Sequence, residues 1–319
     1  MIEESAGNLK FLRNNGFTWI DISGPTRDDM NELARRYQFH ELNLADCLSK
    51  IQIPKIDRYQ NHLFMILHFP TITKETSLPR SSQLSIFMGT GYLVTVHQSE
   101  LKPLIDMFHR CTESSDARQE LMGRSSGYLF HSIIDALVDD LIVTIRSVLG
   151  NIGEIEDEVF DEKLSVAKEI SQIRRKIMSL RRLTIPLRRT LMELSTRDVQ
   201  RFSEEDLTLY FDDVMDHIEK ALETLEASKE TVEIYKDTDF MHGSDKANKI
   251  LAVLTIIFTL SIPSTVAGSF YGMNVYVPGG IESGAWMFLG KYTTFIIIVS
   301  VSSAAAIAML FYFRRLRWI

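Results

Sequence analysis

Charged residues are absent from two long stretches near the C-terminal end of the chain. No Asp, Glu, Lys or Arg occurs from Ile250 to Ile281, and none occurs from Tyr292 to Phe313. About 20 consecutive apolar residues are enough to cross a bilayer as a helix. Two buried core helices of a soluble protein would give similar runs, but their position together at one end favours a membrane. The pattern predicts transmembrane helices at residues 250–271 and 292–313, with an external loop at 272–291.

The charges that flank these runs predict their orientation. Two lysines, Lys246 and Lys249, precede the first run, and the tail at 314–319 carries Arg314, Arg315 and Arg317. Cytoplasmic loops of membrane proteins carry an excess of Lys and Arg. Both termini are therefore expected in the cytoplasm, in a protein that spans the cell membrane twice. In several copies around an axis, the three arginines would form a cytoplasmic basic ring.

Shorter patterns in residues 1–124 predict a cytoplasmic α+β domain. Runs typical of strands occur in the segment FTWIDIS and in both halves of KIDRYQNHLFMILHFP and of QLSIFMGTGYLVTVHQ. Gly89 and Gly91 are expected in the hairpin turn of the last of these segments. The segments PTRDDMNELARRYQ and LKPLIDMFHRC have helical spacing. We expect a mixed sheet with flanking helices.

Helical spacing dominates from Ser125 onward. Residues 125–203 predict a helical hairpin region, in which acidic residues at 154–162 are followed by a basic stretch at 174–189. The two helices would then have complementary faces, unless the charges are simply solvated on exposed surfaces. One apolar stripe predicts a stalk helix at 204–249 that continues to residue 271, roughly 100 Å in all at 1.5 Å per residue.

Composition argues against several functional classes. The chain has 319 residues and a formal net charge of -7, so it lacks the overall basic character of nucleic-acid-binding proteins. Its two cysteines, Cys47 and Cys111, lie far apart without metal-ligand spacing. No nucleophile–base set, phosphate loop or metal-binding histidine cluster is recognisable in the sequence. We therefore expect a protein that is not an enzyme.

The first apolar run has a face suited to lining a pore. Two helices cannot enclose an aqueous path, so a channel needs several copies around an axis. Steps of three or four residues give one face that is polar at both ends and apolar in the middle: Asn248, Leu251, Thr255, Phe258, Ile262, Thr265 and Ser269. Apolar constrictions can gate a pore by dewetting, and polar rings can hold a hydrated ion. The alternative is that the hydroxyls only bond the preceding turn or a neighbouring helix.

Gly272, Met273 and Asn274 follow the first run directly. The carbonyl end of a helix carries partial negative charge, which attracts cations. A ring of asparagine amides would bind the water shell of Mg²⁺ without stripping it, and Gly272 permits a turn there. No His or Cys lies in either run to favour a softer metal. We expect these three residues to form the ion entry and selectivity site.

Several motifs accompany this tripeptide. Pro263 lies in the first run, and a second run and the basic, aromatic end RRLRWI follow. The segments IDALVDD, IPLRR, YFDDVMDH and VLTII lie in the helical region. With this combination the sequence resembles the CorA family of divalent-cation transporters from about residue 40 to the end. The resemblance implies a funnel-shaped homopentamer that mediates Mg²⁺ influx through a pore lined by the first run.

The resemblance also implies that cytoplasmic Mg²⁺ bound between subunits holds the pore shut. The matching metal ligands are Asp213 in YFDDVMDH, Asp135 in IDALVDD and, on the neighbouring α+β domain, Asp46 in HELNLADCL. Three features depart from the family pattern. Ala45 stands where a second acid often occurs, Glu282 is the only carboxylate of the external loop, and the pore positions Leu251, Leu254 and Ile262 are frequently methionine in the family.

Other functions compete with a passive Mg²⁺ channel. The same architecture would also serve transport of Co²⁺, Ni²⁺ or Zn²⁺, with or without protons. A membrane-anchored helical scaffold without transport is a third hypothesis, and the polar stripe and Asn274 argue against it. The expected partners are further copies of the chain, lipid and divalent cations, with no nucleic acid.

Overall fold

The computed structural model describes residues 7–49, 52–73, 76–161, 164–194, 196–273, 275–280 and 284–315. The chain divides into two compact units, Met1–Asp237 and Thr238–Ile319. The first unit contains two hydrophobic cores, and the larger of them extends from Leu12 to Tyr235. The larger core is continuous across residues 124 and 203, and the predicted subdivision of the chain at residues 124, 203 and 249 stays a prediction.

The first unit is built on a 6-stranded sheet. Its strands are β1 (Leu9–Asn14), β2 (Phe17–Ser23), β3 (Lys55–Arg58), β4 (His62–Thr73), β5 (Thr76–Gly89) and β6 (Tyr92–His97). Their order is β1-β2-β6-β5-β4-β3, and the β2–β6 pair is parallel while the other neighbours are antiparallel. Gly91, with φ +77°, closes the β5–β6 hairpin. The mixed sheet and both predicted strand pairs are confirmed.

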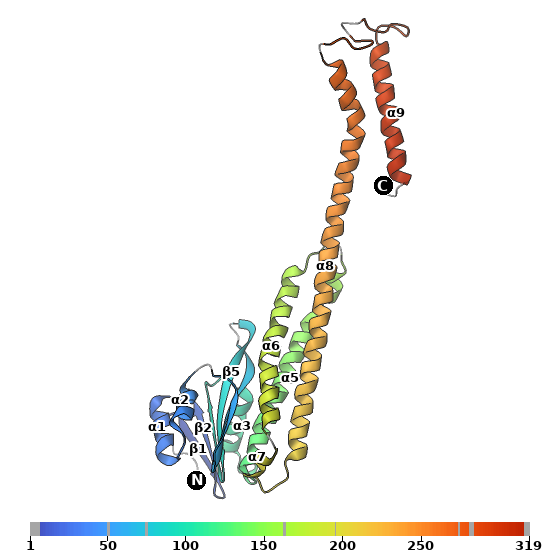
Figure 1. Ribbon diagram of the computed structural model, residues 1–319. Helices are drawn as coiled ribbons and strands as arrows, with labels where there is room; N and C mark the ends of the chain where they lie inside the picture. The colour runs from blue at the N-terminus through green and yellow to red at the C-terminus, as the bar shows by residue number, and fades with distance from the viewer. Residues whose placement is uncertain are drawn as a thin grey trace. The chain divides into compact units, whose positions relative to one another are not determined.

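Alternation along the central strands sends side chains to two separate cores. In β4, Leu63 and Met65 belong to one core, whereas Phe64 and Ile66 belong to the other. Two short helices, α1 (Arg27–Arg36) and α2 (Glu41–Leu48), cover the second face of the sheet. Helices α3 (Lys102–Glu113), α4 (Ser115–Met122) and α5 (Ser126–Val159) lie on the first face (Figure 1).

Three long helices extend the first core away from the sheet. They are α5, α6 (Ala167–Glu193) and the first part of α8 (Thr208–Tyr271), with the short α7 (Thr196–Gln200) between the last two. The Ser125 hydroxyl accepts a hydrogen bond from the Tyr128 amide and caps α5 at the predicted position. A Cβ at Gly127 would lie 2.9 Å from carbons of both Val199 and Leu207, so glycine permits this close approach.

The basic face of α6 pairs with α8. Ion pairs join Arg174 to Glu233 at 3.9 Å, Arg181 to Glu226 and Arg188 to Glu219. Both sets of residues recur every seven positions, about two helical turns, and run in opposite directions along the two helices. Hydrogen bonding from Lys229, together with the charge of Arg181, holds the pKa of Glu226 below its usual range. The expectation that these arginines complement the acidic end of α5 is wrong, because α6 directs them toward α8.

Helix α8 begins at Thr208 and not at the predicted residue 204. The backbone amide and hydroxyl of Thr208 donate to Asp206 Oδ1 at 2.9 and 2.6 Å. The Ser125 and Ser203 hydroxyls donate to the Glu205 carboxylate at 2.8 and 2.9 Å. Such side chains compete with helical backbone bonds and hold these residues in a turn. From Thr208 the helix continues for 64 residues, through Pro263, as the sequence predicts.

The second unit contains both apolar runs. The C-terminal part of α8 and the whole of α9 (Thr293–Arg315) are long and apolar enough to cross a membrane. Large apolar side chains on both are open to the surroundings in the single chain, as Phe258 is by 65% and Phe295 by 66%. The long helix and the two predicted spans are thereby confirmed as elements of the fold.

Candidate metal site and pore helix

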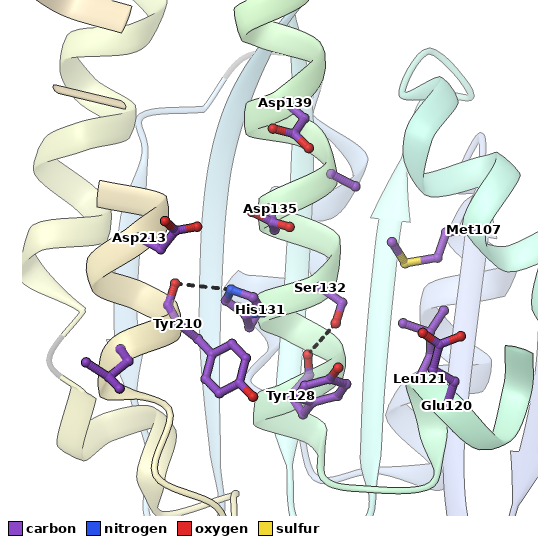
Figure 2. A pocket seen from close by; sticks show the side chains of 12 residues that line it. Met107, Glu120, Leu121, Tyr128, His131, Ser132, Asp135, Asp139, Tyr210 and Asp213 are labelled. Atoms are coloured by element: carbon purple, nitrogen blue, oxygen red, sulfur yellow. Dashed lines mark hydrogen bonds between the residues drawn. The ribbon is translucent and has the colours of Figure 1, made fainter. Parts of the chain in front are cut away.

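A groove in the first unit runs along α5 and the start of α8. Its volume is about 680 Å³, and it is lined by Met107, Glu120, Leu121, Tyr128, His131, Ser132, Asp135, Ala136, Asp139, Leu209, Tyr210 and Asp213. Figure 2 shows Asp135 and Asp139 on the groove side of α5 and Asp213 on the facing turn of α8. Two of the three predicted regulatory ligands therefore lie in this groove.

Asp135 and Asp213 meet a third potential ligand there. Carboxylate oxygens of Asp135 and Asp213 and a ring nitrogen of His217 all lie within 4.8 Å of one another. Asp213 and His217 are four residues apart on α8, so they share one helix face. This spacing is visible in the sequence segment YFDDVMDH, yet His217 was not among the predicted ligands. The proximity of that face to Asp135 on α5 is a result of packing.

Burial makes this site costly for an isolated negative charge. Asp135 is half-buried, and burial raises the pKa of its carboxyl; the negative charges of Asp139 and Asp213 add to this rise, and His131 opposes it. Burial lowers the pKa of His131, whose Nε2 donates to the Tyr210 carbonyl at 3.1 Å. Because burial disfavours a positive charge on the His131 ring, a bound cation would stabilise both carboxylates.

The donor set fits a divalent cation. His217 Nδ1 is buried and accepts or donates no hydrogen bond within the part of the chain that the structure describes. Two carboxylates supply the oxygen ligands that Mg²⁺ prefers, and Mg²⁺ usually keeps several of its waters. An imidazole nitrogen suits transition metals better. Asp135, Asp213 and His217 would therefore hold Mg²⁺ partly through water, or a softer ion through direct contact with nitrogen.

Asp46 lies elsewhere in the single chain. It belongs to α2, on the opposite face of the sheet, and it does not line the groove. Its Oδ2 atom is 2.9 Å from the ammonium nitrogen of Lys55, and its backbone carbonyl accepts a hydrogen bond from Gln83. One chain alone thus brings together Asp135 and Asp213 without Asp46.

The predicted pore-lining residues all lie on the C-terminal part of α8. The eight side chains are exposed in the single chain, as are most neighbours on the same helix: Asn248, Leu251, Leu254, Thr255, Phe258, Ile262, Thr265 and Ser269. The hydroxyls of Thr255 and Thr265 donate to the carbonyls of Leu251 and Ser261 at 2.8 and 2.9 Å. These two threonine hydroxyls therefore bond the preceding turn of the helix, as the alternative hypothesis expects. Each hydroxyl oxygen can still accept a hydrogen bond. The pore-lining role itself stays a prediction.

Gly272 closes the last turn of α8. Its amide donates to the Gly268 carbonyl at 2.9 Å, and a Cβ at this position would come within 2.9 Å of the same oxygen. The Tyr271 hydroxyl donates to the Pro278 carbonyl at 3.0 Å and ties the following loop to the helix end. Of the entry tripeptide, Gly272 and Met273 are described, whereas Asn274 lies outside the described residues.

The predicted basic ring is described only in part. Arg314 and Arg315 are in the last turn of α9. Arg317 lies outside the described residues, as does Glu282 of the external loop. The placement of these charges around an axis stays a prediction.

Comparison with known proteins identifies the family. The model of the CorA-like Mg²⁺ transporter protein family matches residues 14–315. This chain belongs to that family. It is 30% identical over 313 residues to the cobalt/magnesium transport protein CorA of Thermotoga maritima, covering 98% of this chain and 86% of the relative. It is 27% identical over 301 residues to the putative metal ion transporter YfjQ of Bacillus subtilis, covering 94% of this chain and 89% of the relative.

A solved structure supports the same fold. The complete structure of the CorA magnesium transporter from Methanocaldococcus jannaschii matches 97% of this chain and 93% of its own, with a TM-score of 0.74 at 18% identity. Membership in the CorA-like family confirms the resemblance read from the sequence and the expectation of a membrane transporter that is not an enzyme. It also confirms divalent cations as the class of cargo.

Proposed function

We propose that this chain forms a homopentameric channel in the cell membrane that conducts Mg²⁺ into the cytoplasm and that closes when cytoplasmic Mg²⁺ binds between subunits. The observation that carries the regulatory part is the convergence of Asp135, Asp213 and His217 within 4.8 Å. Family membership and two exposed apolar helices support the transport part. Both termini would lie in the cytoplasm, because Lys and Arg flank the two spans there.

Closure follows from the charges of the groove. Without a cation, the carboxylates of Asp135 and Asp213 would repel Asp46 of a neighbouring subunit, which favours separation of the two subunits. A divalent ion removes that repulsion. In the proposed pentamer, Asp46 of a neighbouring subunit would approach Asp213 and share the same ion. Mg²⁺ bound at this site would then stabilise the closed state relative to the open state, by an amount set by the difference in Mg²⁺ affinity between the two states.

Ion entry is assigned to the end of α8. Five copies of Asn274 would present amide oxygens to hydrated Mg²⁺, supported by the helix carbonyl ends and by the turn that Gly272 allows. Below that ring, the stripe from Ser269 to Asn248 would line the path. Its apolar middle, at Phe258 and Ile262, would close the channel by dewetting when the helices approach each other. Arg314, Arg315 and Arg317 would form a basic ring at the cytoplasmic side.

Mg²⁺ flux into liposomes that contain the purified full chain tests both parts. Wild-type protein should conduct Mg²⁺, and flux should fall as Mg²⁺ on the cytoplasmic side rises. Asn274→Ala should abolish flux, whereas the neighbouring Val275→Ala should retain it. Asp213→Asn should leave flux high at cytoplasmic Mg²⁺ concentrations that close the wild type, and Asp212→Asn, outside the three-ligand group, should close normally. Equal flux in Asn274→Ala and wild type would remove Asn274 from the pathway, and normal closure of Asp213→Asn would remove the regulatory site.

Cobalt is a second candidate cargo. The Thermotoga maritima relative is named a cobalt/magnesium transport protein, which supports Co²⁺ as a cargo. The imidazole nitrogen of His217 favours transition metals over Mg²⁺, so Co²⁺ would also bind at the regulatory site. Flux measured with Co²⁺ in place of Mg²⁺ in the same liposomes decides this question. His217→Asn should weaken closure by Co²⁺ more than closure by Mg²⁺ if the nitrogen contacts the metal directly.

A further inference from the structure

Asp46 already has a cationic partner within its own chain. The ammonium nitrogen of Lys55 lies 2.9 Å from Asp46 Oδ2 and 2.8 Å from Asp57 Oδ2. These contacts are charge-assisted hydrogen bonds between a single ammonium and two carboxylates. The group of three side chains therefore carries a formal charge of minus one, and Asp46 is not a free carboxylate.

Neighbouring structure holds Lys55 in this position. Lys55 and Asp57 are two residues apart on β3, so they project from the same face of the strand. The ammonium also lies 5.4 Å from the centre of the Phe64 ring on β4, at cation–π distance. Burial lowers the pKa of Lys55, but hydrogen bonds from its ammonium to Asp57 and Asp46 outweigh burial and raise the pKa overall. Lysine is ordinarily charged at neutral pH, and both carboxylate contacts favour that charge on Lys55.

The contacts are accessible enough to be exchanged. The side chains of Lys55, Asp46 and Asp57 are 35%, 21% and 34% exposed. Ion pairs at such positions contribute little to stability, because water already screens them. A divalent ion that approaches Asp46 would meet a carboxylate whose charge is largely balanced, and it would have to displace or share the ammonium.

We propose that Lys55 is a tethered counter-ion that competes with Mg²⁺ for Asp46 and so sets the Mg²⁺ concentration at which the regulatory site fills. This inference rests on the proposed role of Asp46 in the function above. Lys55 acts through Asp46 and is a positioning residue. Asp57 weakens this competition, because it shares the Lys55 ammonium with Asp46.

A charge series tests the competition in the detergent-purified full chain. The readout is the half-saturating Mg²⁺ concentration, or midpoint, obtained by fitting the Mg²⁺-dependent rise in melting temperature to single-site binding, since a ligand that binds only the folded state stabilises it by RT ln(1 + [L]/Kd). Lys55→Met changes the local charge from minus one to minus two and should lower this concentration about two- to fivefold, the range of exposed ion pairs. Asp57→Asn brings the charge to zero and should raise it by a similar factor.

Two further variants separate competition from a purely structural role. Lys55→Arg keeps the charge and should restore a wild-type midpoint, and Lys55→Met combined with Asp57→Asn restores minus one and should return close to it. Melting in EDTA reports any loss of stability independent of metal. An unchanged midpoint in Lys55→Met, while Asp213→Asn shifts it strongly, would overturn the role of Lys55 and leave the regulatory site intact. No Mg²⁺-dependent rise in the wild type would overturn both.

Discussion

The two ends of α8 place the same helix in opposite environments. Between Val214 and Tyr235 it buries one stripe in the core of the first unit and exposes charged residues that pair with α6. From Ile250 onward it has no charged residue up to Tyr271, and its large apolar side chains are exposed in the single chain. The first part buries its apolar stripe within the single chain, whereas the second leaves its large apolar side chains exposed.

Exposure has a different meaning in the two parts of α8. An exposed apolar face larger than a few hundred Å² on a soluble protein marks an interaction surface. In the second unit nearly the whole helix surface is apolar, so lipid and further copies of the chain are both suitable partners. Within the bilayer, hydrophobicity no longer distinguishes the face that contacts lipid from the face that contacts other helices. Substitutions at matched positions are needed to separate them.

The largest difference is expected between two leucines of α8. Leu225 is 1% exposed and belongs to the core of the first unit, and Leu251 is 59% exposed in the second. Leu225→Ala should lower the free energy of unfolding of the first unit by about 2–5 kcal/mol, because it leaves a cavity in a packed core. Leu251→Ala should change it by less than about 0.5 kcal/mol.

Denaturation in detergent, followed by Trp19 fluorescence, measures this pair of substitutions. Trp19 is fully buried in the first unit, and Trp286→Phe with Trp318→Phe removes the other two tryptophans. If Leu225→Ala and Leu251→Ala lowered the free energy of unfolding by similar amounts, the two parts of α8 would not differ in packing as their burial indicates.

A charge scan within the first span should give the next largest effect. Phe258 is on the predicted pore face, and Ile257 is about 100° around the helix from it. A charged residue that faces lipid at the centre of a span costs about 2.5–3.5 kcal/mol. Ile257→Arg should therefore reduce membrane insertion and assembly. Phe258→Arg should assemble normally, because its charge would face water, but it should block cation flux.

Assembly by native gel or light scattering, and Mg²⁺ flux in liposomes, report on this pair. The predicted orientation of the first span is wrong if Ile257→Arg assembles and Phe258→Arg does not. That result would place the Phe258 face toward lipid and would remove the stripe from Asn248 to Ser269 as the wall of the pore.

The smallest effect is expected at the ion pairs between α6 and α8. Glu219→Gln breaks the exposed pair with Arg188 and should lower the free energy of unfolding of the first unit by about 0.2–1 kcal/mol. The loss should shrink at high salt, since ions screen exposed charges. Glu223→Gln, an exposed position on the same helix, is the matched control and should have no measurable effect. A large, salt-independent loss for Glu219→Gln would indicate that the pair is part of the core packing.

Much of the fold was predictable because its signals are local. The strand pair around Gly91 follows from a turn between two β-rich runs, and the start of α5 at Ser126 follows from the helical spacing that begins near Ser125. The start of α8 was not predicted correctly, because Glu205 and Asp206 hold a turn through contacts with Ser125 and Thr208. The resemblance supplied Asp135 and Asp213, and neither periodicity nor charge identified them.

The amino-acid sequence alone is enough to recognise which segments prefer a membrane, which form strands and helices, and which family the chain belongs to. These properties depend on composition and on spacing within one element. Three contacts become visible only in the folded chain: the α6 arginines meet α8, His217 lies near Asp135, and Lys55 binds Asp46. Each of these contacts joins separate elements of the fold, and the angle and register at which those elements pack are set by the whole core.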